Sequence, residues 1–226
     1  MNSSHIRNHH SGFTLVELLS VIAIVGMLSG ILIAIVGPVR RAARASECQS
    51  NLRQLGLAML QYTIDNHGLL PVQQNVNPNP VGVENPSALI SWWMLMQKRL
   101  ELRFPEAGKA NLFLCPEAMD TYSKPARRTY GLNLAGAGGQ DAVRLSAISL
   151  PAQTLLLAET KENGVDGDGY DVIGFGSITG DRFDWRHKAD TMNAFFADGS
   201  LRALNKSTMT DASPSTLYRM LENLRK

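Results

Sequence analysis

Charge and cysteine are both scarce in this chain of 226 residues, and each scarcity excludes a class of function. Charged residues make up only 19% of the chain, and 22 basic against 20 acidic side chains leave a net charge of +2. No basic stripe is interleaved with aromatic residues, so we expect no nucleic-acid partner. The two cysteines, Cys48 and Cys115, form neither a CxxC motif nor a Cys/His cluster with zinc spacing, and they allow at most one internal disulfide.

Enzymatic motifs are absent as well. The sequence has no P-loop, no HExxH motif and no serine on a nucleophile elbow. His187 lies close in sequence to Asp184, Asp190 and Asp198, a set that would suit a metal site or an acid–base pair. A turn explains Asp198 better, however, and a structural hydrogen bond explains His187 better. We therefore expect a protein that is not an enzyme.

One long run near the N-terminus is almost free of charge. From Phe13 to Val36 the only charged residue is Glu17. A helix of that length would cover roughly 36 Å, enough for a hydrocarbon core of about 30 Å. No small-x-small cleavage site follows the run, so a secretory signal peptide cut after its apolar region is a poor fit. We expect a single-pass membrane helix over residues 13–37, preceded by a polar segment, residues 1–12.

The charges that flank this helix favour a cytoplasmic C-terminal side. Arg40, Arg41 and Arg44 follow the helix, whereas only Arg7 and the amino terminus are reliably positive before it. By the positive-inside rule, this count places the residues after the helix in the cytoplasm.

The segment from Gly12 to Glu17 (GFTLVE) resembles the cleavage and methylation site of type IV prepilins and type II secretion pseudopilins. The resemblance implies that a prepilin peptidase cuts between Gly12 and Phe13 on the cytoplasmic face, and that Phe13 is then N-methylated. It also implies a leader over residues 1–12, a helix in the inner (cytoplasmic) membrane and a periplasmic C-terminal domain. The implied partners are the peptidase and methyltransferase, the membrane, and other pilin-like subunits.

Glu17 lies four residues into the helix, where a carboxylate costs a few kcal/mol on insertion scales. Cleavage would create an ammonium at Phe13, and methylation keeps its charge. Pairing of Glu17 with the Phe13 ammonium of the next subunit would offset the cost and set the axial register between packed helices. The alternative is that Glu17 extends to the headgroups at the helix end.

The rest of the chain resembles a large pilin-like family that is abundant in planctomycetes and their relatives. The similar segments are Cys48 to Ala58, Asn66 to Gly68 with Pro71, Phe113 to Pro116, Tyr130 to Asn133, and Leu155 to Thr160. That family also carries a His followed, after about nine residues, by Asp-Gly. Here His187 precedes Asp198-Gly199 with ten residues between them, and Ser200 stands where the family usually has a His.

Helical periodicity continues past the membrane segment and predicts an amphipathic helix over residues 38–68. Its apolar stripe, with spacings of four and three, consists of Cys48, Leu52, Leu55, Met59 and Tyr62. We expect this stripe to pack on a globular domain rather than in a coiled coil, because the repeat lasts barely two heptads. Pro38 predicts a kink or a break, and Gly68 predicts a left-handed cap at the end of the helix.

Residues 69–226 are predicted to form a globular α+β domain, in which the N-terminal helix packs on an antiparallel sheet as in pilins. A second helix is expected over 87–102, with Trp92 and Trp93 in the core rather than at a membrane interface. A closing helix is expected over 215–225. The predicted strands are 112–114, 154–158, 171–175 and 193–197, and Asp198-Gly199 connects the last of these to 201–204 in a hairpin.

Two features bear on ligands and redox state. Asp166, Asp168 and Asp171 lie in a glycine-rich stretch that offers oxygen ligands to Ca²⁺. Their spacing does not match an EF-hand, so a solvated turn is the simpler interpretation, and no other cofactor is expected. Cys48 and Cys115 would form a disulfide in an oxidising compartment or remain as buried thiols, and the sequence favours neither.

Together these patterns predict a structural subunit of the pseudopilin type, in a type II secretion or type IV pilus-like filament. One alternative is a membrane-anchored exported binding domain that uses the helix only as an anchor. Another is an anchored hydrolase that uses His187 and the nearby aspartates.

Overall fold

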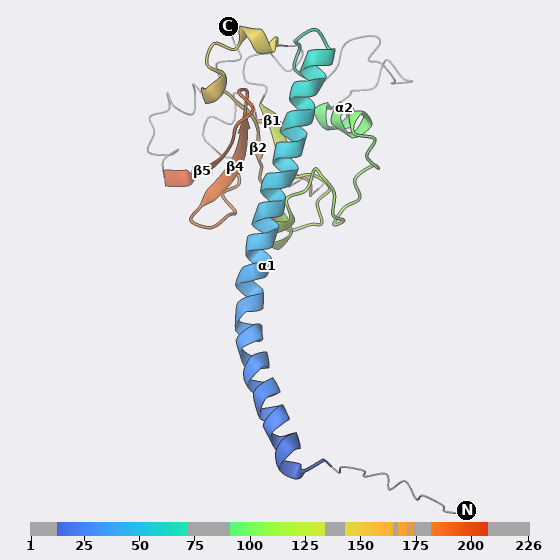
Figure 1. The fold of residues 1–226 in the computed structure, drawn as a ribbon. Coiled ribbons are helices and arrows are strands. Elements are labelled where there is room, and N and C mark those ends of the chain that lie inside the picture. Colours follow the sequence, from blue (N-terminus) through green and yellow to red (C-terminus); the bar gives the residue numbers. More distant parts are fainter. Residues whose placement is uncertain are drawn as a thin grey trace, which may run out of the picture. The chain divides into compact units, whose positions relative to one another are not determined.

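The computed structural model describes residues 13–71, 91–133, 143–164, 167–170, 172–173 and 182–207 (Figure 1). The chain divides into two units, Met1–Ala42 and Ala43–Lys226. One long helix, α1 (Leu15–Asp65), supplies the described helical part of the first unit and the opening helix of the second.

The first half of α1 has no core of its own. Every residue from Phe13 to Ala43 is exposed, and an 18-residue window of α1 reaches a mean hydropathy of 2.8. In the described part of the chain, α1 is the one helix that is long and apolar enough to cross a membrane. Pro38 lies inside this helix and does not break it, because the turns on both sides continue past the single missing N–H donor.

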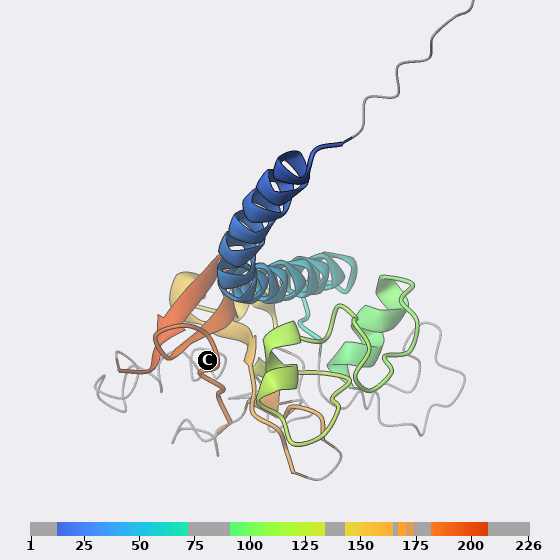
Figure 2. The ribbon, with the colours of Figure 1, turned by 90° about the horizontal axis from the view of Figure 1, so that it is seen from below.

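The second half of α1 packs on the globular domain, as the apolar stripe predicts (Figure 2). Its buried residues are Cys48, Asn51, Leu52, Leu55, Gly56, Ala58, Met59 and Thr63. The helix ends at Asp65, and Gly68 follows with a φ of 81°. The Gly68 N–H donates to the Thr63 carbonyl at 2.8 Å, so the predicted left-handed cap is confirmed.

The domain is built on a five-stranded sheet in the order β3-β1-β2-β4-β5. The strands are β1 (Tyr130–Asn133), β2 (Leu155–Glu159), β3 (Val172–Ile173), β4 (Thr191–Phe196) and β5 (Leu201–Asn205). Four strands pair antiparallel, and β3 pairs parallel to β1 at the edge. This is the predicted α+β fold, a long N-terminal helix packed on an antiparallel sheet.

Alternation along the strands separates two apolar clusters. In β4, Met192, Ala194 and Phe196 pack in one cluster with Phe183, whereas Phe195 belongs to the other cluster, with Leu52 and Leu55 of α1. The Asp198-Gly199 turn connects β4 to β5 as predicted, with Phe195 opposite Leu201. Central strands β1 and β2 are buried along their whole length because both faces of the sheet are covered.

Several elements differ from the predictions. Residues 112–114 are a turn and not a strand, because Phe113 and Leu114 are buried in a loop that runs into the 3₁₀ helix η1 (Pro116–Asp120). Strand β1 was not among the predicted strands. Helix α2 (Trp92–Arg99) is shorter than the predicted helix, although both of its tryptophans are buried in the core as expected. The predicted helix over 215–225 lies outside the described residues.

Candidate functional site

The N-terminal end of α1 is closed by a reciprocal capping box between Thr14 and Glu17. The Glu17 carboxylate oxygen Oε2 accepts hydrogen bonds from the Thr14 N–H and the Thr14 hydroxyl, both at 2.8 Å. The Glu17 N–H in turn donates to the Thr14 hydroxyl oxygen at 3.3 Å. Thr-x-x-Glu is the sequence signature of this cap, so a local signal existed for it, although the cap was not among the predicted features. The Glu17 carboxylate therefore satisfies the Thr14 N–H, and the Thr14 hydroxyl satisfies the Glu17 N–H.

Above this cap, α1 presents a mainly apolar surface as far as Val39, in which Ser20 and Ser29 are the polar side chains. The exposed side chains include Leu18, Ile22, Val25 and Ile33. Gly26 and Gly30 are four residues apart on the helix, and a Cβ added at either would meet nothing within 4 Å. Two glycines at this spacing allow the backbone of another helix to approach closely.

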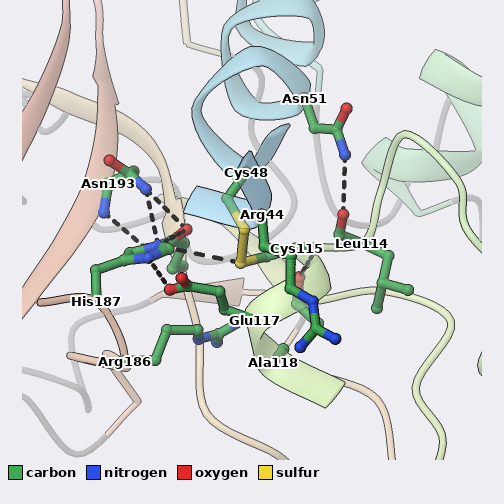
Figure 3. Close-up of a disulfide and its surroundings, with 12 residues drawn as sticks. Arg44, Cys48, Asn51, Leu114, Cys115, Glu117, Ala118, Arg186, His187 and Asn193 are labelled. Atoms are coloured by element: carbon green, nitrogen blue, oxygen red, sulfur yellow. Dashed lines mark hydrogen bonds and ion pairs between the residues drawn. A yellow bond between two sulfur atoms is a disulfide. The ribbon is translucent and has the colours of Figure 1, made fainter. Parts of the chain in front are cut away.

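A second group of polar and reactive residues lies where α1 meets the sheet (Figure 3). Cys48 of α1 and Cys115, the residue before η1, form a disulfide with a Cα–Cα distance of 4.5 Å. Both are fully buried. Of the two states that the sequence left open, the structure therefore contains the disulfide, which joins α1 to a loop 67 residues further along the chain.

The side chain of His187 lies beside this disulfide and is held by two carboxylates. Its Nδ1 bonds to the Glu117 carboxylate of η1, and its Nε2 lies 2.7 Å from Glu159 Oε1 at the end of β2. The Asn193 side-chain nitrogen is 2.9 Å from Nε2, and Cys115 Sγ is 4.0 Å from it. Glu159 is fully buried, and its Oε2 accepts the Asn193 N–H at 2.7 Å.

Electrostatics favour the charged form of this histidine. Burial of the ring on its own lowers the pKa of His187, but the hydrogen bonds and charges of Glu159 and Glu117 outweigh it and raise the pKa above its ordinary value. A doubly protonated ring donates one hydrogen bond to each carboxylate. The cluster thus balances a buried Glu159 with a neighbouring cation.

Arg186 adds a second buried cation next to the cluster. Its guanidinium donates to the Thr160 carbonyl at 2.5 Å and to Asp184 at 3.0 Å, and it stacks 5.3 Å from the centre of the Tyr122 ring. Burial raises the pKa of Tyr122 to about 12, although Arg186 opposes this shift, so the phenol stays neutral. In the described part of the chain, the Arg186 NH1 nitrogen has no hydrogen-bond partner.

Of the three aspartates near His187 in sequence, Asp184 and Asp198 bond to other side chains, and Asp190 accepts the Lys206 N–H through its backbone carbonyl at 2.9 Å. Asp184 pairs with Arg186, and Asp198 accepts hydrogen bonds from the Ser200 N–H and hydroxyl at 3.0 and 2.6 Å. No hydrogen bond joins His187 to any of the three in the described residues. His187 lies before β4 and Asp198-Gly199 after it, so the two halves of the His/Asp-Gly motif occupy opposite ends of one strand. Sequence reasoning did not identify Glu117 or Glu159, because nothing local marks either residue.

Asp168, one of the three residues proposed for calcium, is buried in an ion-pair network. Its Oδ1 accepts the Arg127 N–H at 2.6 Å, and its Oδ2 lies 2.7 Å from Arg128 NH2 and 3.0 Å from Arg127 NH2. Both carboxylate oxygens are therefore engaged by arginine. Asp166 and Asp171 lie outside the described residues, so the calcium hypothesis remains a prediction.

Comparison with known proteins adds two matches. Residues 7–33 match the family model described as Prokaryotic N-terminal methylation motif, and residues 38–103 match the one described as Protein of unknown function (DUF1559). No curated protein and no solved structure matches the chain. The first match contains Gly12, Phe13 and the Thr14–Glu17 cap, and the second begins at Pro38 and extends beyond α2. On these matches, the chain carries the prokaryotic N-terminal methylation motif, which marks it as a type IV pilin-like precursor, followed by a region that matches the DUF1559 family.

Proposed function

We propose that this protein is a structural subunit of the pseudopilin type, in a type II secretion or type IV pilus-like filament. In this proposal the precursor is cleaved after Gly12, and Phe13 becomes the N-methylated first residue. The observation that carries the proposal is the first half of α1, an entirely exposed apolar helix that begins two residues after the cleavage point. The methylation-motif match over residues 7–33 supports the same processing.

The exposed helix needs an apolar environment at every stage. A row of exposed leucine, isoleucine and valine side chains is unfavourable in water, because burying each such side chain contributes about 1.5–3 kcal/mol. The membrane supplies this environment before assembly, and the helices of neighbouring subunits supply it in the filament. Gly26 and Gly30 support close packing between such helices.

Glu17 can serve its own helix and a neighbour at the same time. Both Thr14 hydrogen bonds go to Oε2, and Oε1 accepts no hydrogen bond from the described residues. The capping box therefore leaves one carboxylate oxygen for the Phe13 ammonium of an adjacent subunit. Such a pair in an apolar filament core is screened little by solvent, so it would favour one axial register.

The same proposal implies where the protein is located and which proteins it contacts. The helix anchors the protein in the inner membrane as a single span, with the globular domain on the periplasmic side. The partners are other pilin-like subunits and the prepilin peptidase that also methylates Phe13. We further propose a structural rather than an enzymatic role, since both ring nitrogens of His187 are engaged by Glu117 and Glu159.

One observation favours the alternative of an anchored binding domain. An open groove of about 390 Å³ lies on the domain surface between Leu102 and Phe113, and Phe104 lines it with 56% of its surface exposed. In that alternative the helix is only an anchor, the precursor keeps Met1, and substitutions at Glu17 do not affect any assembly.

The first experiment is intact-mass and peptide mass spectrometry of protein extracted from membranes. A chain that starts at N-methyl-Phe13 supports the proposal, whereas an intact Met1 contradicts it and supports the anchored binding domain.

A second experiment measures how well Glu17→Gln is incorporated into filaments. It distinguishes the capping role of Glu17 from the role of its charge, because glutamine can close a capping box but cannot form an ion pair with an ammonium. We expect Glu17→Gln and Glu17→Ala to insert into the membrane and to incorporate poorly. Normal incorporation of Glu17→Gln would contradict the register argument, and Thr14→Ala is the control that weakens the cap while keeping the charge.

A further inference from the structure

Four potential metal ligands converge at the disulfide. The Sγ atoms of Cys48 and Cys115, a Glu159 carboxylate oxygen and a ring nitrogen of His187 all lie within 4.8 Å of one another. They come from α1, the loop before η1, the end of β2 and the segment before β4, and Figure 3 labels Cys48, Cys115 and His187 among them. Two sulfurs, one imidazole and one carboxylate form a donor set that suits tetrahedral zinc.

We propose that the reduced form of this protein binds one Zn²⁺ ion at Cys48, Cys115, Glu159 and His187. The disulfide and the zinc site are alternative states of the same residues, because a sulfur in a disulfide is not a thiolate ligand. This inference concerns the globular domain alone and does not depend on filament assembly.

The surrounding hydrogen bonds orient both non-sulfur ligands. Glu117 bonds to Nδ1 of His187, which directs Nε2 toward the sulfurs. A carboxylate on the outer nitrogen of a histidine is the usual support of a zinc-bound imidazole. The Asn193 N–H holds Glu159 Oε2 at 2.7 Å, and Oε1 faces the ring and accepts the Asn193 side-chain amide at 3.1 Å, a hydrogen bond that zinc would replace.

The movements that zinc requires are small. In a tetrahedral zinc site, a sulfur ligand and a nitrogen ligand lie about 3.6 Å apart. The distance between His187 Nε2 and Cys115 Sγ is 4.0 Å, which is close to this value. The two sulfurs must separate from bonding distance to about 3.8 Å, and the Glu159–His187 hydrogen bond must open by under about 1 Å. Rotation of the cysteine side chains, with a small shift of the loop before η1, provides this space.

The chemistry balances with a phosphine or dithiol as the reductant. Reduction breaks the S–S bond, and two electrons and two protons convert the sulfurs to two thiols while the reductant is oxidised. Zinc then replaces both thiol protons and the proton on His187 Nε2, and all three protons pass to solvent. Two thiolates and Glu159 leave the zinc centre with one net negative charge, and the buried guanidinium of Arg186, which also pairs with Asp184, is a cation that interacts with Glu159.

Such a site would hold α1 to the loop before η1 in a reducing compartment as well as in an oxidising one. Where thiols stay reduced, zinc would hold α1 to the loop before η1, and in an oxidising compartment the disulfide does so. The loop joined in this way is 67 residues away from Cys48, so each link constrains the unfolded chain strongly.

The test uses the full-length chain purified in detergent. One sample is reduced with a phosphine and a matched sample is kept oxidised, and both are equilibrated with zinc and desalted. We expect about one zinc per reduced chain and none per oxidised chain, with disulfide status read from intact mass.

Spectroscopy tests the coordination of the bound ion. Cobalt in place of zinc should give the visible absorption of tetrahedral coordination and a sulfur-to-cobalt charge-transfer band. X-ray absorption at the zinc edge should count two sulfur ligands. A reduced chain that binds no zinc, or a cobalt spectrum of octahedral type, would overturn the proposal.

Matched variants test whether His187 and Glu159 bind the zinc together with the two cysteines or whether the cysteines bind it alone. We expect His187→Gln and Glu159→Gln each to weaken zinc binding at least about tenfold, and Glu117→Gln to weaken it about 10–100-fold through the ligand that it orients. His67→Asn and Glu106→Gln, which alter exposed residues elsewhere, should leave the affinity unchanged. Unchanged affinity in both His187→Gln and Glu159→Gln would show that the cysteines act alone and would overturn the proposal. If these variants fail to fold, the ligand count on the wild-type protein decides the matter.

Discussion

Asp168 shows how burial and charge decide the role of a single residue. The sequence places it in a polar, glycine-rich stretch that suits a solvated turn or a calcium loop. In the structure it is fully buried, and the guanidinium groups of Arg127 and Arg128 lie at 3.0 and 2.7 Å from its Oδ2. A carboxylate in such a place is a structural ion pair, because both charges have already been removed from water.

We therefore expect Asp168→Asn to be strongly destabilising. The variant leaves Arg128 buried without its counter-charge, so the free energy of unfolding should fall by about 3–5 kcal/mol. Urea unfolding followed by fluorescence measures this loss. The control is Asp120→Asn, because the Arg44–Asp120 pair at 2.6 Å is largely exposed and should contribute no more than about 1 kcal/mol. Equal effects of the two substitutions would contradict this account.

Asp198, in the β4–β5 turn, makes a pH-dependent contribution to the folding stability of the domain. Partial burial on its own raises the pKa of this carboxyl, but the Ser200 hydrogen bonds and the charge of Arg202 outweigh it and lower the pKa below 3.8. A depressed folded pKa stabilises the protein above the unfolded pKa, and this contribution is lost as the pH falls through the folded value. Asp198→Asn should thus lower stability at neutral pH, by under about 1 kcal/mol because the site is exposed. Urea titrations at neutral and strongly acidic pH should show the difference from wild type disappearing in acid, whereas a difference independent of pH would count against the charge.

At the scale of the element, α1 is one helix with two different surfaces. Its first half is exposed and mainly apolar, whereas its second half is buried on one face only. At Gly56 this second half lies close to the sheet, because a Cβ there would overlap the ring of Phe195 in β4. The helix accepts a glycine at this point because contact with β4 leaves no space for a side chain.

Gly56→Ala should consequently destabilise the domain despite the better helix propensity of alanine. Overpacking against Phe195 costs about 1–3 kcal/mol, which exceeds the gain of about 1 kcal/mol from propensity. Gly37→Ala is the matched control on the same helix, since nothing lies within 4 Å of the added Cβ. Thermal unfolding should show a lower melting temperature for the Gly56 variant alone. A Gly56 variant as stable as wild type would mean that α1 can move away from β4 without penalty.

At the scale of the whole molecule, the two units have different surfaces, because the described part of the first is an exposed and mainly apolar helix and the second is a domain with a buried core. The described residues of the first unit, 13–42, are all exposed, whereas the disulfide, the sheet and both apolar clusters belong to the second unit. The second unit therefore has a complete core of its own.

A chain that starts at Ala43 should fold as a soluble monomer without detergent. Its free energy of unfolding should match that of the domain in the full chain within about 0.5 kcal/mol, because only exposed residues are lost. Size-exclusion chromatography with light scattering gives its mass, and urea unfolding gives its stability. Aggregation of the shortened chain, or a clearly lower unfolding midpoint, would show that the first half of α1 supports the domain.

Local sequence patterns were sufficient for much of this fold. Period-3.6 apolar spacing predicted the buried face of α1, Gly68 predicted its cap, and Asp198-Gly199 predicted the β4–β5 hairpin. Each of these depends on residues within a few positions of one another. The same reasoning gave a strand at 112–114, which is wrong, because a short apolar run equally fits a buried turn.

What the sequence determined by itself is the long helix, its apolar first half and the Gly12–Glu17 motif, since composition and spacing along one helix specify all three. Only the tertiary structure decided that Cys48 meets Cys115, that His187 lies between Glu117 and Glu159, and that Asp168 is held by two arginines. The partners of His187 are 70 and 28 residues away in the chain. Their meeting depends on which strands pair and which face of the sheet α1 covers, and that is set by packing of the whole domain rather than by any local pattern.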